Sequence, residues 1–244
     1  MIKVIVHVAK AIVAAITALL FYSCGFGDFK TVDGNGNVTT QTRTVAGEFN
    51  GISASKGLEV IIEPGSESSI TVEADENLHS HITTVVENGV LEINADVNIG
   101  NAASKKVIVK LPDIGSIESS GGASVKSNAP IKGKALELSA SGGASLNLSV
   151  EVKNLSCESS SGSSLEVSGQ AQDLQAEASS GSTLDAAKLT AGSIQSDASS
   201  GGTCIVNPTD KLSADASSGG SVLYVNTPSN LDKKTSSGGS VKQQ

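Results

Sequence analysis

Apolar and polar residues alternate in short stretches along most of this 244-residue chain. After Pro112 the alternation is tied to one short phrase, Ser-Gly followed by Gly or Ser, which occurs seven times within residues 119–241. The spacings between successive phrases are 18 to 21 residues. A near-constant period of this size is typical of repeat architectures. The first glycines of the phrases are Gly121, Gly142, Gly162, Gly181, Gly201, Gly219 and Gly238.

Each phrase has a fixed set of apolar positions around it. In the five best-aligned repeats an aliphatic residue lies seven positions before the glycine, at Leu155, Leu174, Ile194, Leu212 and Leu231. A mostly small residue lies five positions before it, and an aliphatic residue or cysteine lies three positions after it. This alternation predicts strands with one face inward. Glycine adopts backbone conformations that other residues avoid, so the phrase itself predicts a corner.

Strand, corner, strand and a looser turn, repeated about every 20 residues, predict an all-β right-handed parallel β-helix. The handedness follows the usual preference of parallel crossovers. Equivalent positions of successive rungs would stack at about 4.8 Å. A leucine-rich repeat would need a dense leucine pattern, and a propeller would need blades of about 40 residues, so both are excluded.

Residues 44–115 predict a strand-rich segment that precedes the rungs of residues 116–241 in one body, residues 44–241. The stretch 58–63 alternates and ends at the turn Pro64-Gly65, and further alternating stretches cover 70–74, 81–87, 90–95 and 105–111. Asn88-Gly89 is a specific hairpin signal, because a tight hairpin turn needs positive φ at both central residues.

The N-terminal residues 1–23 have the features of a secretory signal. Lys3 and Lys10 accompany an apolar run over 11–22, which is short for a membrane-spanning helix. Ser23-Cys24-Gly25 follows, which resembles a bacterial lipoprotein signal that is cut before a lipid-bearing cysteine. We expect Cys24 to be the lipid attachment site; ordinary cleavage nearby is the alternative. Residues 24–43, rich in Gly, Asn and Thr, predict a flexible tether.

Composition limits the partners of this chain. The net charge is −8, aromatic residues make up 2% of the chain, and Arg43 is its only arginine. Nucleic-acid binding needs a basic stripe and stacking aromatics, so no nucleic-acid partner is expected. The mature chain lacks tryptophan and paired catalytic groups, so we expect neither an enzyme nor a cofactor.

Two clusters could bind a metal. His79 and His81 would share a face of a strand, but no further ligand follows at zinc spacing, so a solvated surface is the simpler interpretation. The position four residues before the glycine carries a row of acids. Stacked carboxylates could bridge calcium, or they could form a hydrated ladder that keeps the solenoid soluble. No firm metal site follows. The row is Glu158, Glu177, Asp197 and Asp215.

The cysteines of the repeats occupy inward positions. Cys204 replaces Val or Leu, and Cys157 replaces Ala or Ser, in their respective ladders. We expect both to be buried as small apolar residues. They lie on different rungs at different positions, so a disulfide between them is not expected.

The N-terminal motifs resemble a known family. AGEFNGISASKGLEVIIEPG at 46–65, ITVEADENL at 70–78 and VENGVLEI at 86–93, followed by the serial Ser-Gly rungs, resemble the auto-transporter adhesin, head GIN domain family. The resemblance covers roughly residues 46–241. It implies a right-handed β-helix similar to pectin-lyase-like proteins and a role in cell adhesion without catalytic residues.

These observations predict a non-catalytic, adhesin-like protein that presents a Ser/Thr/Gly-rich face to a surface glycan or protein. It would be an exported lipoprotein of the bacterial envelope, anchored through Cys24 to the outer membrane and facing the periplasm or the cell surface. The terminal rung would fray or self-associate with a second copy, because an open strand edge invites pairing. The alternatives are a carbohydrate-active β-helix enzyme and a structural or signalling lipoprotein of the envelope.

Overall fold

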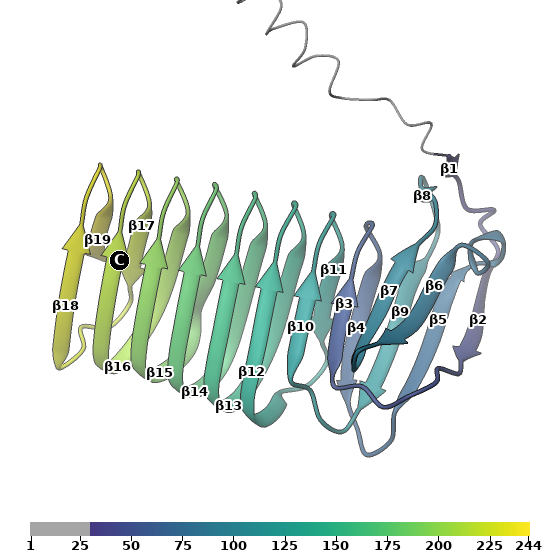
Figure 1. Cartoon of the computed structure of the whole chain (residues 1–244), viewed down its shortest axis with the longest axis horizontal. Helices are drawn as coiled ribbons and strands as arrows, with labels where there is room; N and C mark the ends of the chain where they lie inside the picture. The colour runs from purple at the N-terminus through teal and green to yellow at the C-terminus, as the bar shows by residue number, and fades with distance from the viewer. Residues whose placement is uncertain (1–29) are drawn as a thin grey trace, which may run out of the picture. The chain divides into compact units, whose positions relative to one another are not determined.

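A computed structural model describes residues 30–244, and this part of the chain is built almost entirely of strands (Figure 1). The compact body comprises Val32–Gln244. Its first elements are β1 (Thr31–Val32), β2 (Val38–Arg43), β3 (Gly51–Ala54), β4 (Glu59–Pro64), β5 (Ser69–Asp75), the 3-10 helix η1 (Glu76–Leu78), β6 (Ile82–Glu87), β7 (Val90–Ala95), β8 (Asn98–Ile99) and β9 (Lys105–Leu111).

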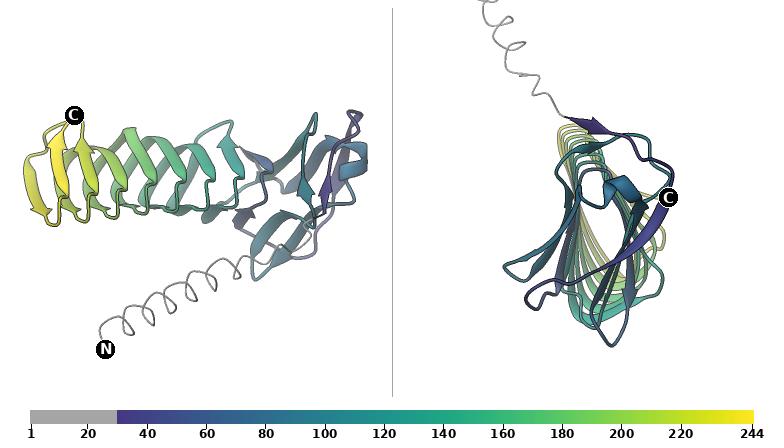
Figure 2. Two further views of the ribbon diagram at one scale, coloured as in Figure 1. Left: turned by 90° about the horizontal axis from the view of Figure 1, so that it is seen from above. Right: turned by 90° about the vertical axis from the view of Figure 1, so that its right-hand side faces the viewer.

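The rest of the body consists of stacked rungs. Its strands are β10 (Ser116–Ser119), β11 (Ser124–Ser127), β12 (Ile131–Ala140), β13 (Ser145–Ser159), β14 (Ser164–Ala178), β15 (Thr183–Ala198), β16 (Thr203–Ala216), β17 (Ser221–Tyr224), β18 (Asn230–Thr235) and β19 (Ser240–Gln243). All pairings among them are parallel, so the fold is an all-β parallel solenoid, as the repeats predicted. Figure 2 shows the rungs as flattened coils stacked one behind the other.

Each rung contributes one stretch to each of two facing layers. We call the layer of residues that precede the Ser-Gly corner face A, and the layer of residues that follow it face B. The predicted inward positions stack in register on face A, where Leu155 pairs with Leu174 and Leu174 with Ile194. These side chains are buried with their counterparts from face B in one continuous core. The narrow core therefore accounts for the abundance of small aliphatic residues.

Every Ser-Gly corner is a tight turn with positive φ at both central residues, as in Ser161 (φ 53°) and Gly162 (φ 71°). The turn closes by a backbone hydrogen bond, for example from the Ser163 N–H to the Ser160 carbonyl at 3.2 Å. These are the features of a type I′ turn. In the first two phrases the turn is shifted by one residue, so that Gly121 and Gly122 are both central. The shift explains part of the irregular glycine spacing.

An eighth corner of the same kind lies before the seven found in the sequence. Lys56 (φ 54°) and Gly57 (φ 67°) are its central residues, and the Leu58 N–H bonds to the Ser55 carbonyl at 3.4 Å. It joins β3 and β4, which pair in parallel with β10 and β11. Strands β7 and β9 form one more rung on the far side, because they pair in parallel with β3 and β4. The rungs at this end are therefore not stacked in chain order.

The N-terminal end of the solenoid is closed by antiparallel strands. On face A, β6 pairs with β7 through the predicted hairpin turn, where Asn88 (φ 51°) and Gly89 (φ 79°) are central. On face B, β5 pairs with β9, and β2 pairs with β5. Helix η1 lies between the faces and buries Leu78 completely. We call this part, made of β2, β5, η1 and β6, the N-terminal cap (Figures 1 and 2).

The prediction of a flexible tether over residues 24–43 is wrong for residues 32–43. Strand β2 is part of the cap, and the loop before it is bound to the body. Gly36 N–H donates to Asp75 Oδ2 at 2.8 Å, and Asn35 N–H donates to Asn77 Oδ1 at 2.9 Å. The Gly- and Asn-rich composition therefore provides a tight loop with backbone donors. Residues 24–29 of the predicted tether lie outside the described residues.

Candidate functional site

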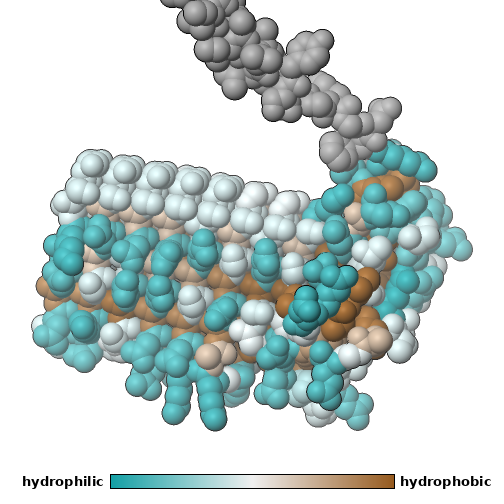
Figure 3. All heavy atoms as spheres, in the orientation of Figure 1, coloured by the Kyte–Doolittle hydropathy of each residue, from teal (hydrophilic) through white to brown (hydrophobic). Residues whose placement is uncertain are grey.

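The corners form a continuous ridge along one edge of the solenoid, which we call the serine ridge. Its exposed first central residues from the third phrase on are Ser161, Ser180, Ser200, Ser218 and Ser237. Backbone hydrogen bonds join neighbouring corners, as from the Gly162 N–H to the Ser180 carbonyl at 3.1 Å. Figure 3 shows the ridge as a pale band along one edge of the molecule. The ridge is a regular surface of hydroxyl and backbone groups.

A second set of serines lies behind the ridge and is buried. Ser163 Oγ donates to the Ala140 carbonyl at 2.8 Å, and Ser182 Oγ donates to the Ser159 carbonyl at 2.6 Å. Ser163 and Ser182 are at most 3% exposed. These hydroxyls hold one rung to the preceding one, which is a structural role.

The predicted row of acids forms on face A, next to the ridge. Glu158 pairs with Glu177, Glu177 with Asp197, and Asp197 with Asp215. We call these four residues the acidic row. A shallow groove of about 330 Å³ runs along them and the adjacent serines. The same register continues towards the cap through Ser139, Glu118, Ser53 and Glu92, and it ends at Lys234 in the other direction.

Side-chain donors partly balance the acidic row. Gln175 Nε2 donates to Glu177 Oε1 at 2.8 Å, and Gln195 Nε2 donates to Asp197 Oδ2 at 3.2 Å. Within residues 30–244, no three His, Cys, Asp or Glu side chains are arranged to hold a metal ion. Glu158, Glu177 and Asp215 are exposed, and Asp197 is partly buried.

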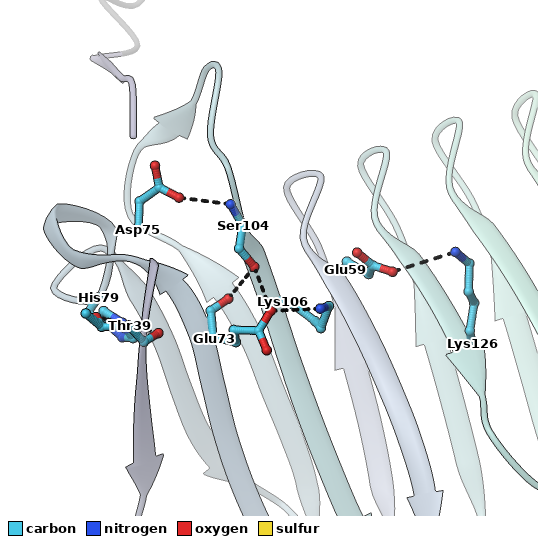
Figure 4. Close-up of polar contacts among 8 residues, drawn as sticks. All are labelled: Thr39, Glu59, Glu73, Asp75, His79, Ser104, Lys106 and Lys126. Atoms are coloured by element: carbon cyan, nitrogen blue, oxygen red, sulfur yellow. Dashed lines mark hydrogen bonds and ion pairs between the residues drawn. The ribbon is translucent and has the colours of Figure 1, made fainter. Parts of the chain in front are cut away.

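Face B differs from face A because four of its acids, Glu59, Glu63, Glu73 and Glu166, are paired with lysines. Lys106 Nζ lies 2.8 Å from Glu73 Oε1, and Lys126 Nζ lies 3.6 Å from Glu59 Oε1 (Figure 4). The hydrogen bond from Lys106 lowers the pKa of Glu73, and the same bond raises the pKa of Lys106. Unpaired acids therefore gather on face A alongside the ridge.

Asp75 joins the cap to the loop before β2. Its side chain is buried, and one oxygen accepts a hydrogen bond from the Ser104 N–H at 2.9 Å (Figure 4). The other accepts a hydrogen bond from the Gly36 N–H at 2.8 Å. These backbone donors stabilise the carboxylate, and the largest effect, that of Ser104, holds the pKa of Asp75 below its usual value. Asp75 is a structural anchor.

The two histidines do not lie as predicted. His79 follows η1 and is only 4% exposed, with its Nε2 atom 3.0 Å from Thr39 Oγ1 (Figure 4). His81 lies near the surface, with Nδ1 2.8 Å from Asp96 Oδ1. The expectation that both are solvated residues of one strand is therefore wrong, because η1 turns the chain inward between β5 and β6.

A hollow lies in the N-terminal cap, and no pattern in the sequence predicted it. It has a volume of about 890 Å³. It lies where β2, the loop to β3 and the turns next to β5, β7 and β9 come together. We call it the cap cleft. It is lined by Thr42, Arg43, Thr44, Val45, Gly47, Glu48, Phe49, Asn50, Ser68, Ser69, Ile70, Gly89, Pro112 and Asp113.

The two cysteines of the repeats are buried free thiols, as predicted. Burial raises the pKa of the Cys157 thiol strongly and that of the Cys204 thiol to about 12. Neither has the lowered pKa of a reactive cysteine. They fill space in the core.

Two features relevant to membrane attachment are the predicted N-terminal lipid anchor and any helix that could span a membrane. The lipid attachment predicted at Cys24 and the signal predicted over residues 1–23 lie outside the described residues. In the part that is described, no helix has the length and apolar character needed to cross a membrane.

Comparison with known proteins identifies the family. The family model described as "Putative auto-transporter adhesin, head GIN domain" matches residues 48–228, so the chain belongs to this family. An adhesin-type family indicates a cell-surface or exported protein. No curated protein matches this chain.

Solved structures show the same fold. A "putative adhesin" from Bacteroides fragilis superimposes with a TM-score of 0.80 at 17% identity, covering 87% of this chain and 100% of the other. A "putative lipid binding protein" from Parabacteroides distasonis gives 0.71 at 20% identity, covering 88% and 100%. A "putative adhesin" from Parabacteroides merdae gives 0.65 at 21% identity, covering 88% and 99%.

Proposed function

We propose that this protein is a non-catalytic, adhesin-like protein of the bacterial envelope that presents the serine ridge and the acidic row to a macromolecular partner. The observation that carries the proposal is the continuous bonding of the ridge. Because each corner is hydrogen-bonded to the next, the surface is held rigid over many rungs. A rigid, repetitive surface can contact an extended glycan or protein at several equivalent positions, so that weak contacts add up.

The proposal includes an anchor in the membrane. Acylation of Cys24 would tether the solenoid to the outer membrane, facing the periplasm or the outside. A metabolic label with an alkyne-bearing fatty acid tests this step. We expect the wild-type chain to take up the label and to be found in the membrane fraction. A Cys24→Ser variant should take up no label and should be absent from the membrane fraction. Labelling that persists in the variant would contradict the anchor.

The binding test uses the chain from residue 24 with Cys24→Ser, which contains the compact body of Val32–Gln244. It is applied to an array of glycans and matrix proteins with and without calcium. Binding without conversion of the ligand supports the adhesin, and calcium dependence would indicate that the acidic row bridges the ion to the partner. Conversion of a glycan would instead identify the protein as a carbohydrate-active enzyme.

Substitutions on the ridge locate the contact. Ser161→Asp, Ser180→Asp and Ser200→Asp together add charge at exposed central positions, and aspartate tolerates the left-handed backbone there. Ser66→Asp, at another exposed position, is the control. We expect the triple variant to lose binding and the control to keep it. Full binding by the triple variant would show that the ridge is not the contact surface.

A further inference from the structure

We infer that the cap cleft is a saccharide-binding site, in which Arg43, Glu48 and Asp113 hold the hydroxyl groups of a sugar beside Phe49. The inference rests on the proposed adhesin function and adds to the serine ridge a second, separate contact site, whose ligand is assigned a chemical class. The cleft is about 890 Å³ in volume. Ligand sites of small molecules have volumes of this order, so one or two sugar rings would fit.

Its lining offers both kinds of hydrogen-bonding partner. The guanidinium of Arg43 only donates, while the carboxylates of Glu48 and Asp113 only accept. Asn50 and Ser69 can do either. A sugar hydroxyl donates one hydrogen bond and accepts others, so a ring with several hydroxyls can use both sets of groups at once.

Arg43 is held in place with hydrogen-bonding capacity to spare. Its Nη2 atom donates to the His79 carbonyl at 2.7 Å, and this is the guanidinium's one hydrogen bond to the described residues. Its Nε atom is buried without a partner. None of the ion pairs of residues 30–244 involves Arg43. Its remaining N–H groups, on Nη1 and Nη2, have no further partner among the described residues and can donate to a ligand in the cleft.

Phe49 adds the apolar surface that a sugar ring needs. It is one of four phenylalanines in the chain, and it is partly buried against the core while lining the cleft. The C–H groups on one side of a sugar ring can pack on such a ring face, while its hydroxyls point to the polar groups. Aromatic side chains combine a large contact area with low conformational freedom, which suits a recognition site.

A fatty acid fits the cleft less well. It would need one donor for its carboxylate and a continuous apolar tube for its chain. The apolar residues of the cleft, Val45, Phe49, Ile70 and Pro112, are instead interspersed with polar and charged ones. Glu48 and Asp113 would also repel an anionic ligand. Because the lining carries two acids and one base, a neutral polyhydroxyl ligand matches it better.

The test compares two matched double variants of the chain from residue 24 with Cys24→Ser. Glu48→Gln with Asp113→Asn removes two carboxylates from the cap cleft, and both residues are exposed, so folding should not suffer. Glu177→Gln with Asp197→Asn makes the same chemical change in the acidic row. An array of neutral, sulfated and uronic-acid oligosaccharides identifies the probe with the tightest binding. Calorimetric titration with that oligosaccharide then measures each variant, and palmitate serves as a lipid probe.

We expect the cleft variant to bind the oligosaccharide at least about tenfold more weakly, because hydrogen bonds to charged groups are lost. The acidic-row variant should have an affinity within about twofold of the parent's, because its carboxylates lie outside the cap cleft. A twofold change in affinity is a small fraction of the binding free energy. If only the acidic-row variant binds the oligosaccharide more weakly, or if neither variant does, the inference is overturned and the adhesin function still stands. Binding to matrix proteins with no oligosaccharide, or to palmitate in preference to all sugars, would overturn it as well.

Discussion

Lys233 Nζ lies 2.8 Å from the Tyr224 hydroxyl, to which it donates a hydrogen bond, and 4.6 Å from the centre of the Tyr224 ring. Lys233 occupies the inward ladder position that Ala214 has on the rung before. A charged residue therefore stands in the last rung where the four preceding rungs carry small residues, Cys157, Ala176, Ser196 and Ala214. Inward-pointing charges are one way in which proteins protect exposed strand edges from pairing.

The proposed self-association through the terminal rung should therefore be weak in the wild-type chain and stronger in Lys233→Val. Removal of the charge leaves the inward side of β18 without a charge to oppose pairing. We expect dimers to form at about tenfold lower concentration, which corresponds to about 1.4 kcal/mol. Sedimentation velocity over a range of concentrations measures this, with Lys242→Val on the exposed side of the same rung as the control. Equal behaviour of the two variants would show that Lys233 does not protect the edge.

Two adjacent glycines of one corner should respond differently to alanine. Gly219 has φ of +76°, and no atom lies within 4 Å of an added Cβ. Gly219→Ala should therefore lower the free energy of unfolding only by the strain of an alanine in the left-handed conformation, about 1–2 kcal/mol. At Gly220 an added Cβ would lie 2.3 Å from the Ala198 carbonyl oxygen. Gly220→Ala must therefore move the backbone and should cost about 3 kcal/mol. Denaturant unfolding of both variants measures the losses, and the reverse order would contradict this account of the corner.

Acid should weaken the cap through Asp75. Its folded pKa is lowered by the Ser104 and Gly36 N–H groups, so its contribution to stability is present above the unfolded pKa and is lost as pH falls through the folded one. This places the loss below about pH 4. We expect Asp75→Asn to lower the melting temperature at pH 7 and to flatten its decline between pH 5 and pH 2, as followed by circular dichroism.

The exposed Asp173 gives the matched control for this prediction, because it lies outside the cap. Asp173→Asn should leave both the melting temperature and its pH dependence close to those of the parent. A steep acid decline that is unchanged in Asp75→Asn would assign acid sensitivity to other carboxylates.

The buried thiols should be inert in the folded protein. With the pKa of Cys204 raised to about 12 by burial and that of Cys157 raised further, almost no thiolate is present at pH 8. In a Cys24→Ser chain, a chromogenic disulfide reagent should label neither thiol within hours and both at once in guanidinium chloride. Rapid labelling of one thiol in the native state would show that the rungs around it open locally.

The repeats could be understood from the sequence because each rung contacts mainly its neighbours. A period near 19 residues fixes which side chains stack, so the inward ladder of Leu155 and its counterparts and the acidic row followed directly. Glycine at the corners had a local cause as well, since both central residues need positive φ. The fold, the buried cysteines and the Asn88-Gly89 hairpin all rest on interactions between residues close in sequence or one period apart.

The N-terminal cap depended on contacts that no local pattern contains. Strand β2 was predicted to be part of a tether, yet it pairs with β5, and His79 is buried because η1 turns inward. The eighth corner was hidden because Lys56 replaces serine and the next rung is not the next in the chain. The cap cleft is lined by segments as distant as Thr42 and Asp113. Only the tertiary structure could bring these together, because the antiparallel strands of the cap have no repeat period to set their register.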